Sequence, residues 1–125
     1  MKKDRDKIWK KFGKRCAYCG CILETSTGKH MHVDHVDPVR RNWWTNNEMM
    51  FPDNDVEDNL FPSCPPCNNY KHSMTLETFR DQVGMAHDRL KKSASYRNAV
   101  RFGMVKVKDW DKVFWFEKYV ANKET

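Results

Sequence analysis

Two cysteine pairs constrain the fold of this chain more than any other feature. Cys16 and Cys19 form one C-x-x-C pair, and Cys64 and Cys67 form a second pair far downstream. One such pair is weak evidence, but two pairs supply the four tetrahedral thiolate ligands of a closed structural zinc site. Such a site can contribute roughly 10–16 kcal/mol of apparent binding free energy, enough to decide whether a small domain folds. We therefore expect Zn²⁺ on these four cysteines.

Two other readings of the cysteines stay open. The thiols could be free and buried, or one pair could be redox-active. Cys21 is the odd fifth cysteine; we expect it to be a bystander, although it could replace Cys19 as a ligand. The segment between Cys19 and Cys64 is longer than in a simple zinc ribbon, which indicates that it serves a further purpose.

The bulk properties favour a polyanionic partner. The chain has 125 residues, fits one domain, and carries a formal net charge of +6 with a pI of about 9.1. Such a balance favours nucleic acid. No basic amphipathic stretch or bilayer-length apolar run argues for a membrane. The first residues lack the apolar segment of a secretory signal, so we expect a cytoplasmic protein, where paired cysteines more often bind metal than form disulfides.

Periodicity and turn residues predict a chain of short elements. Strand 30–36 alternates its side chains, and Pro38 ends it. Pro65 suits the first turn of a helix. The expected order is helix 4–12, strand 30–36, a mainly irregular segment 39–58, strand 59–62, helix 65–72, helix 76–92, helix 95–102, and a hairpin pairing 104–108 with 112–117.

Asp34, His35 and Asn68 form a set suited to phosphodiester hydrolysis. The reaction needs a base for the attacking water and a cation to hold charge on the phosphate and the leaving oxygen. Histidine titrates near neutrality and suits the first task. Carboxylate and amide oxygens suit Mg²⁺ or Mn²⁺. Taken singly, a histidine is more often a buried structural residue.

Residues 16–71 resemble the HNH, or ββα-metal, endonuclease family. The resemblance rests on C-x-x-C, then Asp34-His35 with a proline three residues later, then Asp58-Asn59-Leu60, then C-x-x-C-N-x-x-K, all in the family's order. It implies that Asp34 and Asn68 bind the catalytic cation, that His35 is the general base, and that Asn59 braces the site loop and orients the base. It also implies DNA cleavage with 5′-phosphate and 3′-hydroxyl ends.

The chain departs from the family pattern between His35 and Asn59. This loop is longer than usual and contains no glycine. Neighbouring residues of a flat strand also point to opposite faces, so Asp34 and His35 share a site only if the strand twists or ends there. A metal pair of His32 and Asp34 is the reserve assignment.

Basic residues around this set are candidates for nucleic-acid contact. Arg40 and Arg41 precede Trp43 and Trp44, a mixture of cations and flat rings typical of nucleic-acid-binding loops. On the expected helix, Lys71 and His72 lie beside Asn68. Solvation alone explains these charges equally well. Clustered charge at Arg89, Lys91 and Lys92 can simply complement a helix dipole, and DNA contact by Lys106, Lys108 and Lys112 stays open.

We therefore predict a small α+β fold, with residues 1–125 as a single HNH endonuclease domain. A zinc-stabilised ββα-metal core spans about residues 14–74, and a C-terminal helix and β-hairpin extension spans 75–125. The competing function is a non-catalytic four-cysteine zinc module that binds nucleic acid. A third, a zinc-stabilised protein-interaction domain, predicts no salt-sensitive DNA affinity. Monomer and dimer are both compatible with the sequence.

Overall fold

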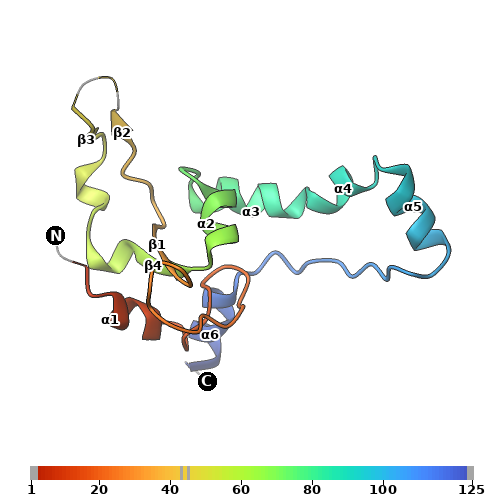
Figure 1. Cartoon of the computed structure of the whole chain (residues 1–125), viewed down its shortest axis with the longest axis horizontal. Coiled ribbons are helices and arrows are strands. Elements are labelled where there is room, and N and C mark those ends of the chain that lie inside the picture. Colours follow the sequence, from red (N-terminus) through yellow and green to blue (C-terminus); the bar gives the residue numbers. More distant parts are fainter. Residues whose placement is uncertain (1–2, 43, 45, 124–125) are drawn as a thin grey trace.

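A pair of short strands and one helix form the centre of the protein (Figure 1). The computed structural model describes residues 3–42, 44 and 46–123. Strand β1 (His32–His35) pairs antiparallel with β4 (Leu60–Ser63), so that His32 lies opposite Ser63 and His35 opposite Leu60. Helix α2 (Pro65–Lys71) follows β4 directly. These three elements were predicted from the sequence, and each is confirmed within two residues of its expected limits.

The start of α2 is fixed by its own sequence. Cys64 is the N-cap residue, and its sulfur accepts a hydrogen bond from the backbone N–H of Cys67 at 3.4 Å. Pro65 occupies the first turn, where its missing N–H would have had no intrahelical partner. The helix ends at His72, whose φ of 51° cannot continue it. One cysteine pair is therefore held on the first turn of a helix.

The other cysteine pair lies on a tight loop between α1 (Arg5–Lys10) and β1. Asp4 caps α1 by accepting from the N–H of Lys7 at 3.1 Å, and Ile8 is buried. Gly20 closes the loop with a φ of +79°, and a Cβ there would lie 3.3 Å from the Trp115 side chain. Only glycine adopts that backbone conformation without a steric cost.

The segment between β1 and β4 contains more structure than expected. Two-residue strands, β2 (Arg41–Asn42) and β3 (Glu48–Met49), pair antiparallel, and two 3₁₀ turns follow at Pro52–Asn54 and Glu57–Asn59. Trp43 lies outside the described residues.

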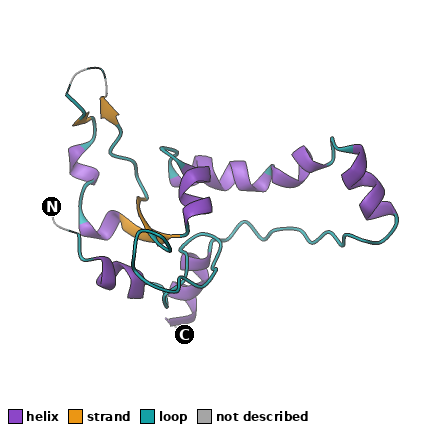
Figure 2. Cartoon of the chain, in the orientation of Figure 1, coloured by secondary structure: helices purple, strands orange, loops and turns teal. Residues whose placement is uncertain are grey.

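The helix predicted over 76–92 is divided. Helix α3 (Leu76–Gly84) is capped by Thr75 and buries Phe79, whereas α4 (Ala86–Leu90) buries no residue. Helix α5 (Ala94–Arg101) follows after a turn. In Figures 1 and 2 these helices extend away from the centre, and an irregular segment returns to it. The apolar spacing continues past Gly84, but no core remains there for it to pack against.

The predicted C-terminal hairpin is wrong. In the described chain, residues 104–113 form no strand, and residues from Trp115 to Lys123 form helix α6. The backbone N–H groups of Trp115 and Phe116 donate to the carbonyls of Tyr18 and Ala17 at 3.2 and 2.8 Å. The Glu117 carboxylate accepts from the N–H of Phe114 at 3.0 Å, which stabilises a helix start. The aromatic residues pack on the cysteine loop instead of pairing as strands.

An aromatic core joins these elements. Phe114 is buried and stacks on Phe79 with ring centroids 5.4 Å apart. Tyr18 meets both rings edge-on, at 5.3 and 5.4 Å. The result is a mixed α+β fold with small antiparallel sheets, as predicted apart from the hairpin. Among the described residues, no helix has the length and apolar character needed to cross a bilayer.

Candidate active site

The four predicted cysteines meet at one point. The sulfurs of Cys16, Cys19, Cys64 and Cys67 all lie within 4.8 Å of one another, and those of Cys19 and Cys64 are 3.8 Å apart. Four ligands at a Zn–S distance of about 2.3 Å form a tetrahedron with edges of about 3.8 Å. The cluster is therefore consistent with a structural zinc site. Cys21 is exposed and lies outside this set.

A small hollow of about 240 Å³ lies between the end of β1, the segment that follows it, and α2. Of the residues proposed from the sequence, its lining includes Asp34, His35, Asn68, Arg40, Arg41 and His72. Asp34 and His35 both reach the hollow because β1 ends at His35, so the flat-strand alternation stops there. His32 is not part of the lining.

The Asp34 carboxylate is held by two buried donors. Its Oδ2 lies 3.1 Å from the Lys71 ammonium and also accepts a hydrogen bond from the Tyr18 hydroxyl. Oδ1 takes part in neither contact. Burial raises the pKa of Asp34, and the charge of Lys71 and the Tyr18 hydrogen bond offset only part of that rise. Burial and the neighbouring carboxylate raise the pKa of Tyr18, so the phenol stays a donor.

Lys71 does not occupy the place that the sequence suggested. Its side chain is 0% exposed, and its ammonium donates to the His35 carbonyl at 3.0 Å as well as to Asp34. An ammonium enclosed in this way cannot reach a phosphate. The predicted nucleic-acid contact by Lys71 is therefore wrong. The i+3 spacing from Asn68 turns the lysine inward, under β1.

His35 has a partner that the sequence did not indicate. Its Nε2 lies 2.8 Å from Oδ1 of Asp55. The hydrogen bond from His35 lowers the pKa of Asp55, which keeps that carboxyl ionised. An ionised carboxylate only accepts hydrogen bonds, so Nε2 carries the hydrogen of this contact, and in a neutral imidazole the acceptor is then Nδ1. Asp55 is one of several acids in an irregular segment, and no spacing signal distinguished it.

Asn59 ties the ends of the long segment together. Its side-chain oxygen accepts from the N–H of Asp37 at 2.9 Å, and its amide nitrogen donates to the carbonyls of Asp37 and Asn54 at 2.8 and 2.7 Å. The backbone N–H of Val36 also donates to the Asn59 carbonyl at 2.9 Å. Asn59 thus forms hydrogen bonds with residues that follow His35, whereas the hydrogen bond of the His35 imidazole is with Asp55.

Asn68 lies on the first turns of α2 and faces β1. Its amide nitrogen lies 3.0 Å from Nδ1 of His32. The side-chain oxygen of Asn68 takes no part in this contact, and Asn68 lines the hollow. His32 is thus engaged by the asparagine, which does not favour the reserve metal pair of His32 and Asp34.

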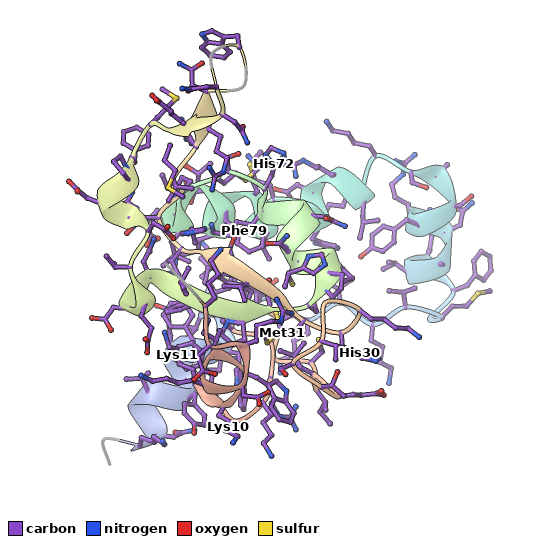
Figure 3. All side chains as sticks on the ribbon, turned by 60° about the vertical axis from the view of Figure 1, so that its left-hand side comes forward. Lys10, Lys11, His30, Met31, His72 and Phe79 are labelled. Atoms are coloured by element: carbon purple, nitrogen blue, oxygen red, sulfur yellow. The ribbon has the colours of Figure 1, made fainter. Side chains whose placement is uncertain are left out.

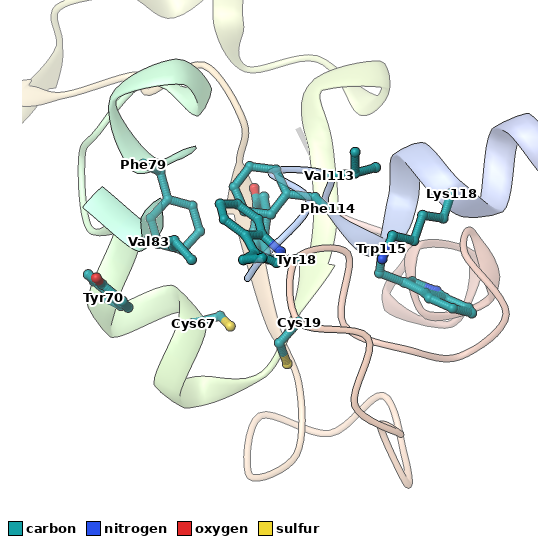
Figure 4. A pocket seen from close by; sticks show the side chains of 11 residues that line it. Tyr18, Cys19, Cys67, Tyr70, Phe79, Val83, Val113, Phe114, Trp115 and Lys118 are labelled. Carbon is teal, nitrogen blue, oxygen red and sulfur yellow. The ribbon is translucent and has the colours of Figure 1, made fainter. Parts of the chain in front are cut away.

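A second hollow of about 470 Å³ is lined in part by Cys19 and Cys67 of the cysteine cluster (Figure 4). Aromatic and aliphatic side chains, including Tyr70, Phe79, Val83 and Trp115, line it, with Lys118 at its edge. It contains no carboxylate and no histidine. Of these two hollows, the one beside His35 is lined by an acid and by histidines.

The arrangement is that of a ββα-metal type of site. It consists of two strands, a helix, a four-cysteine cluster and an Asp-His pair at the strand end. The family model for HNH endonucleases matches residues 16–74, which span all of these elements. Residues 16–74 are therefore an HNH endonuclease domain, with a cysteine cluster consistent with zinc. A search of curated proteins and a search of solved structures each found no match to this chain.

Proposed function

We propose that this protein is a metal-dependent endonuclease that hydrolyses DNA phosphodiester bonds and leaves 5′-phosphate and 3′-hydroxyl ends. One observation carries the proposal: Asp34, His35 and Asn68 line the same small hollow. A carboxylate, an imidazole and an amide side by side are the groups that water activation and cation binding require. The match of residues 16–74 to the HNH family supports the same reaction and a nucleic-acid substrate.

Asp34 and Asn68 are the residues that would hold the catalytic Mg²⁺ or Mn²⁺. Both offer oxygen ligands, which these cations prefer. Lys71 and Tyr18 both contact Oδ2 of Asp34, so Oδ1 is the oxygen that would bind the cation. When bound, the cation supplies positive charge for the phosphate and the leaving oxygen.

His35 acts as the general base in this proposal, and Asp55 orients it. The 2.8 Å contact with Asp55 fixes the ring and places the hydrogen on Nε2. Nδ1 then takes the proton from the attacking water. Asn59 holds the residues after His35 in place through its contacts with Asp37 and Asn54. The site loop therefore keeps the imidazole at the hollow.

Arg40, Arg41 and His72 are the proposed phosphate contacts around the cleavage site. All three are exposed and line the hollow. The Arg40 guanidinium donates to the carbonyl of Ser73 at 3.3 Å, and Ser73 also lines the hollow. Phosphate contacts of this kind set the register of a nucleic acid without reading its sequence.

The test is cleavage of a supercoiled plasmid with added Mg²⁺ or Mn²⁺ by the His35→Ala variant. A general base contributes typically 10²–10⁴-fold, so we expect cleavage to fall by at least about a hundredfold. Duplex binding and the folded state should be preserved. His30→Ala is the matched control, because His30 does not line the hollow. Cleavage by His35→Ala at the parental rate would exclude His35 as the base.

The cysteine cluster and the basic net charge also favour a second function, a zinc module that binds nucleic acid without cutting it. The same plasmid assay separates the two. The binding module predicts salt-sensitive duplex affinity and intact plasmid with every divalent cation tried.

A further inference from the structure

The positive charge of this protein is concentrated away from the hollow. Residues 85–108, here called the basic arm, hold seven lysines and arginines and one aspartate. The arm therefore carries the whole formal net charge of +6, and the rest of the chain sums to zero. It consists of α4, α5 and the first part of the returning segment, which extend away from the strand pair and α2 in Figure 1.

Charges on the arm are exposed and mostly without an acidic partner. Arg89, Lys91, Lys92, Arg97, Arg101, Lys106 and Lys108 are all exposed. Among the described residues, one acid lies within ion-pair distance of any of them: Asp88, whose Oδ1 is 3.5 Å from Lys91 Nζ. Two basic residues outside the arm are paired with acids: Lys7 lies 2.5 Å from Glu57, and Arg80 lies 2.6 Å from Glu117.

Local contacts give the arm a defined shape. Ser93 caps α5 by accepting from the N–H of Tyr96 at 3.3 Å, and the Tyr96 ring meets His87 edge-on at 5.5 Å. Arg97 donates to the carbonyl of Lys91 at 2.5 Å, across the turn between α4 and α5. Arg97 and Arg101, four residues apart, lie on one face of α5. The cations are thus presented by an ordered surface.

We propose that the basic arm is a second DNA-binding surface, which holds the phosphate backbone of a duplex outside the cleavage site. Exposed cations without acidic partners release counterions from DNA at no cost in lost ion pairs, which is the main source of backbone affinity. The proposal rests on the proposed nuclease function for its substrate, and it extends the DNA contact well beyond Arg40, Arg41 and His72. Leu90, Phe102 and Met104 are exposed on the arm too, so a second copy of the chain is the competing occupant.

The experiment compares two triple variants with the same loss of charge. The arm variant is Lys92→Gln, Lys106→Gln and Lys108→Gln. The control is Lys10→Gln, Lys14→Gln and Lys29→Gln, three exposed lysines on the side of α1 and the cysteine loop, where Lys10 and His30 appear in Figure 3. Binding to a duplex of about 30 base pairs is followed by fluorescence anisotropy from about 50 to 300 mM KCl, without added divalent cation.

Each phosphate contact contributes a slope of about 0.9 to the dependence of log K on log salt. If three contacts are lost, the slope falls by about 3, and the affinity near 0.15 M salt falls on the order of a hundredfold. The control should change affinity by less than about threefold. Equal affinities of the two triple variants would overturn the proposal.

Cleavage kinetics and light scattering distinguish the arm proposal from the proposed nuclease function and from a dimer interface. With added Mg²⁺ or Mn²⁺, the arm variant should show a raised KM and an unchanged kcat. A wild-type protein that binds duplex through the arm and never cuts it refutes the nuclease function and leaves the arm proposal standing. If Phe102→Ser with Met104→Ser turns a dimer into a monomer in light scattering while the arm variant binds DNA like wild type, the arm is a dimer interface instead.

Discussion

The centre of the protein and the basic arm use charge in opposite ways. In the centre, Lys71 and Asp34 are enclosed together, and their side chains are 0% and 5% exposed. On the arm, Phe102 and Met104 are 75% and 79% exposed, and six of the seven cations lack an acidic partner among the described residues. One region buries its charges in pairs, and the other leaves both charge and apolar surface open to solvent.

The difference reflects the cost of removing charge from water. A buried ion loses several kcal/mol of hydration and survives only when it is paired and hydrogen-bonded. The buried pair therefore fixes geometry, here the position of Asp34 and of the His35 carbonyl. An exposed cation keeps its hydration, contributes little to folding, and is available to a polyanion. The two regions are thus suited to different tasks, positioning a reaction and holding a substrate.

Loss of the cysteine cluster should have the largest effect of all. Cys64→Ser removes one sulfur ligand and the N-cap of α2 together. Because structural zinc contributes roughly 10–16 kcal/mol, we expect a chain without cooperative unfolding and without bound zinc. Cys21→Ser is the control and should keep one zinc per chain. The measurements are metal analysis and urea denaturation followed by circular dichroism. A folded Cys64→Ser protein would show that packing alone holds α2 to the cysteine loop.

Replacing one lysine in each region should change the free energy of unfolding by very different amounts. Lys71→Met leaves the buried Asp34 carboxylate without its cation, and breaking a buried pair costs about 3–5 kcal/mol. Lys92→Met removes an exposed charge, which changes the free energy of unfolding by about 0.5 kcal/mol at most. Urea denaturation of both variants measures the contrast. Equal losses would mean that the Lys71–Asp34 pair contributes no more than a surface charge.

The loss of unfolding free energy in Lys71→Met should also depend on pH. Burial raises the pKa of Asp34 in the folded protein above its unfolded value, so the folded state holds the proton more tightly. Stability from this group is present at low pH and is lost as pH rises through the folded pKa. Without Lys71 the rise in pKa is larger. The difference between Lys71→Met and wild type should therefore shrink as the pH falls toward the acid range.

The His35–Asp55 pair lies between the two extremes, because both side chains are about one-sixth exposed. Asp55→Asn should lower kcat about 10–100-fold, the usual cost of removing an orienting partner, and leave KM nearly unchanged. Asp55→Glu should restore part of the rate, since it returns a carboxylate. Steady-state cleavage of a labelled duplex measures both constants. A change confined to KM would place Asp55 in substrate binding instead.

Several parts of the structure followed from local sequence. The C-x-x-C pairs predicted the cysteine cluster, and Cys64-Pro65 predicted the start of α2. The alternation ended by Pro38 predicted β1. Each C-x-x-C spacing, the start of α2 and the end of β1 depend on residues within a few positions of one another, whose preferences are local. The two cysteine pairs themselves are far apart in the chain and meet only in the folded protein.

Other parts depended on partners distant in the chain. The aromatic segment around Phe114 has strand-like composition, yet its N–H groups bond to the cysteine loop and it becomes α6. In the sequence Lys71 resembles a surface cation, but in the structure its side chain is buried next to β1. Asp55 had no distinguishing neighbour until its segment folded back against His35.

Sequence alone therefore determined which chemistry this chain carries: four thiolates at metal spacing, and an acid, an imidazole and an amide in family order. The tertiary structure decided which of these groups reach solvent and which are enclosed. Spacing along a chain specifies the ligands and the element that bears them, because those interactions are local. Burial is set by the whole fold, since only packing against distant segments removes a side chain from water.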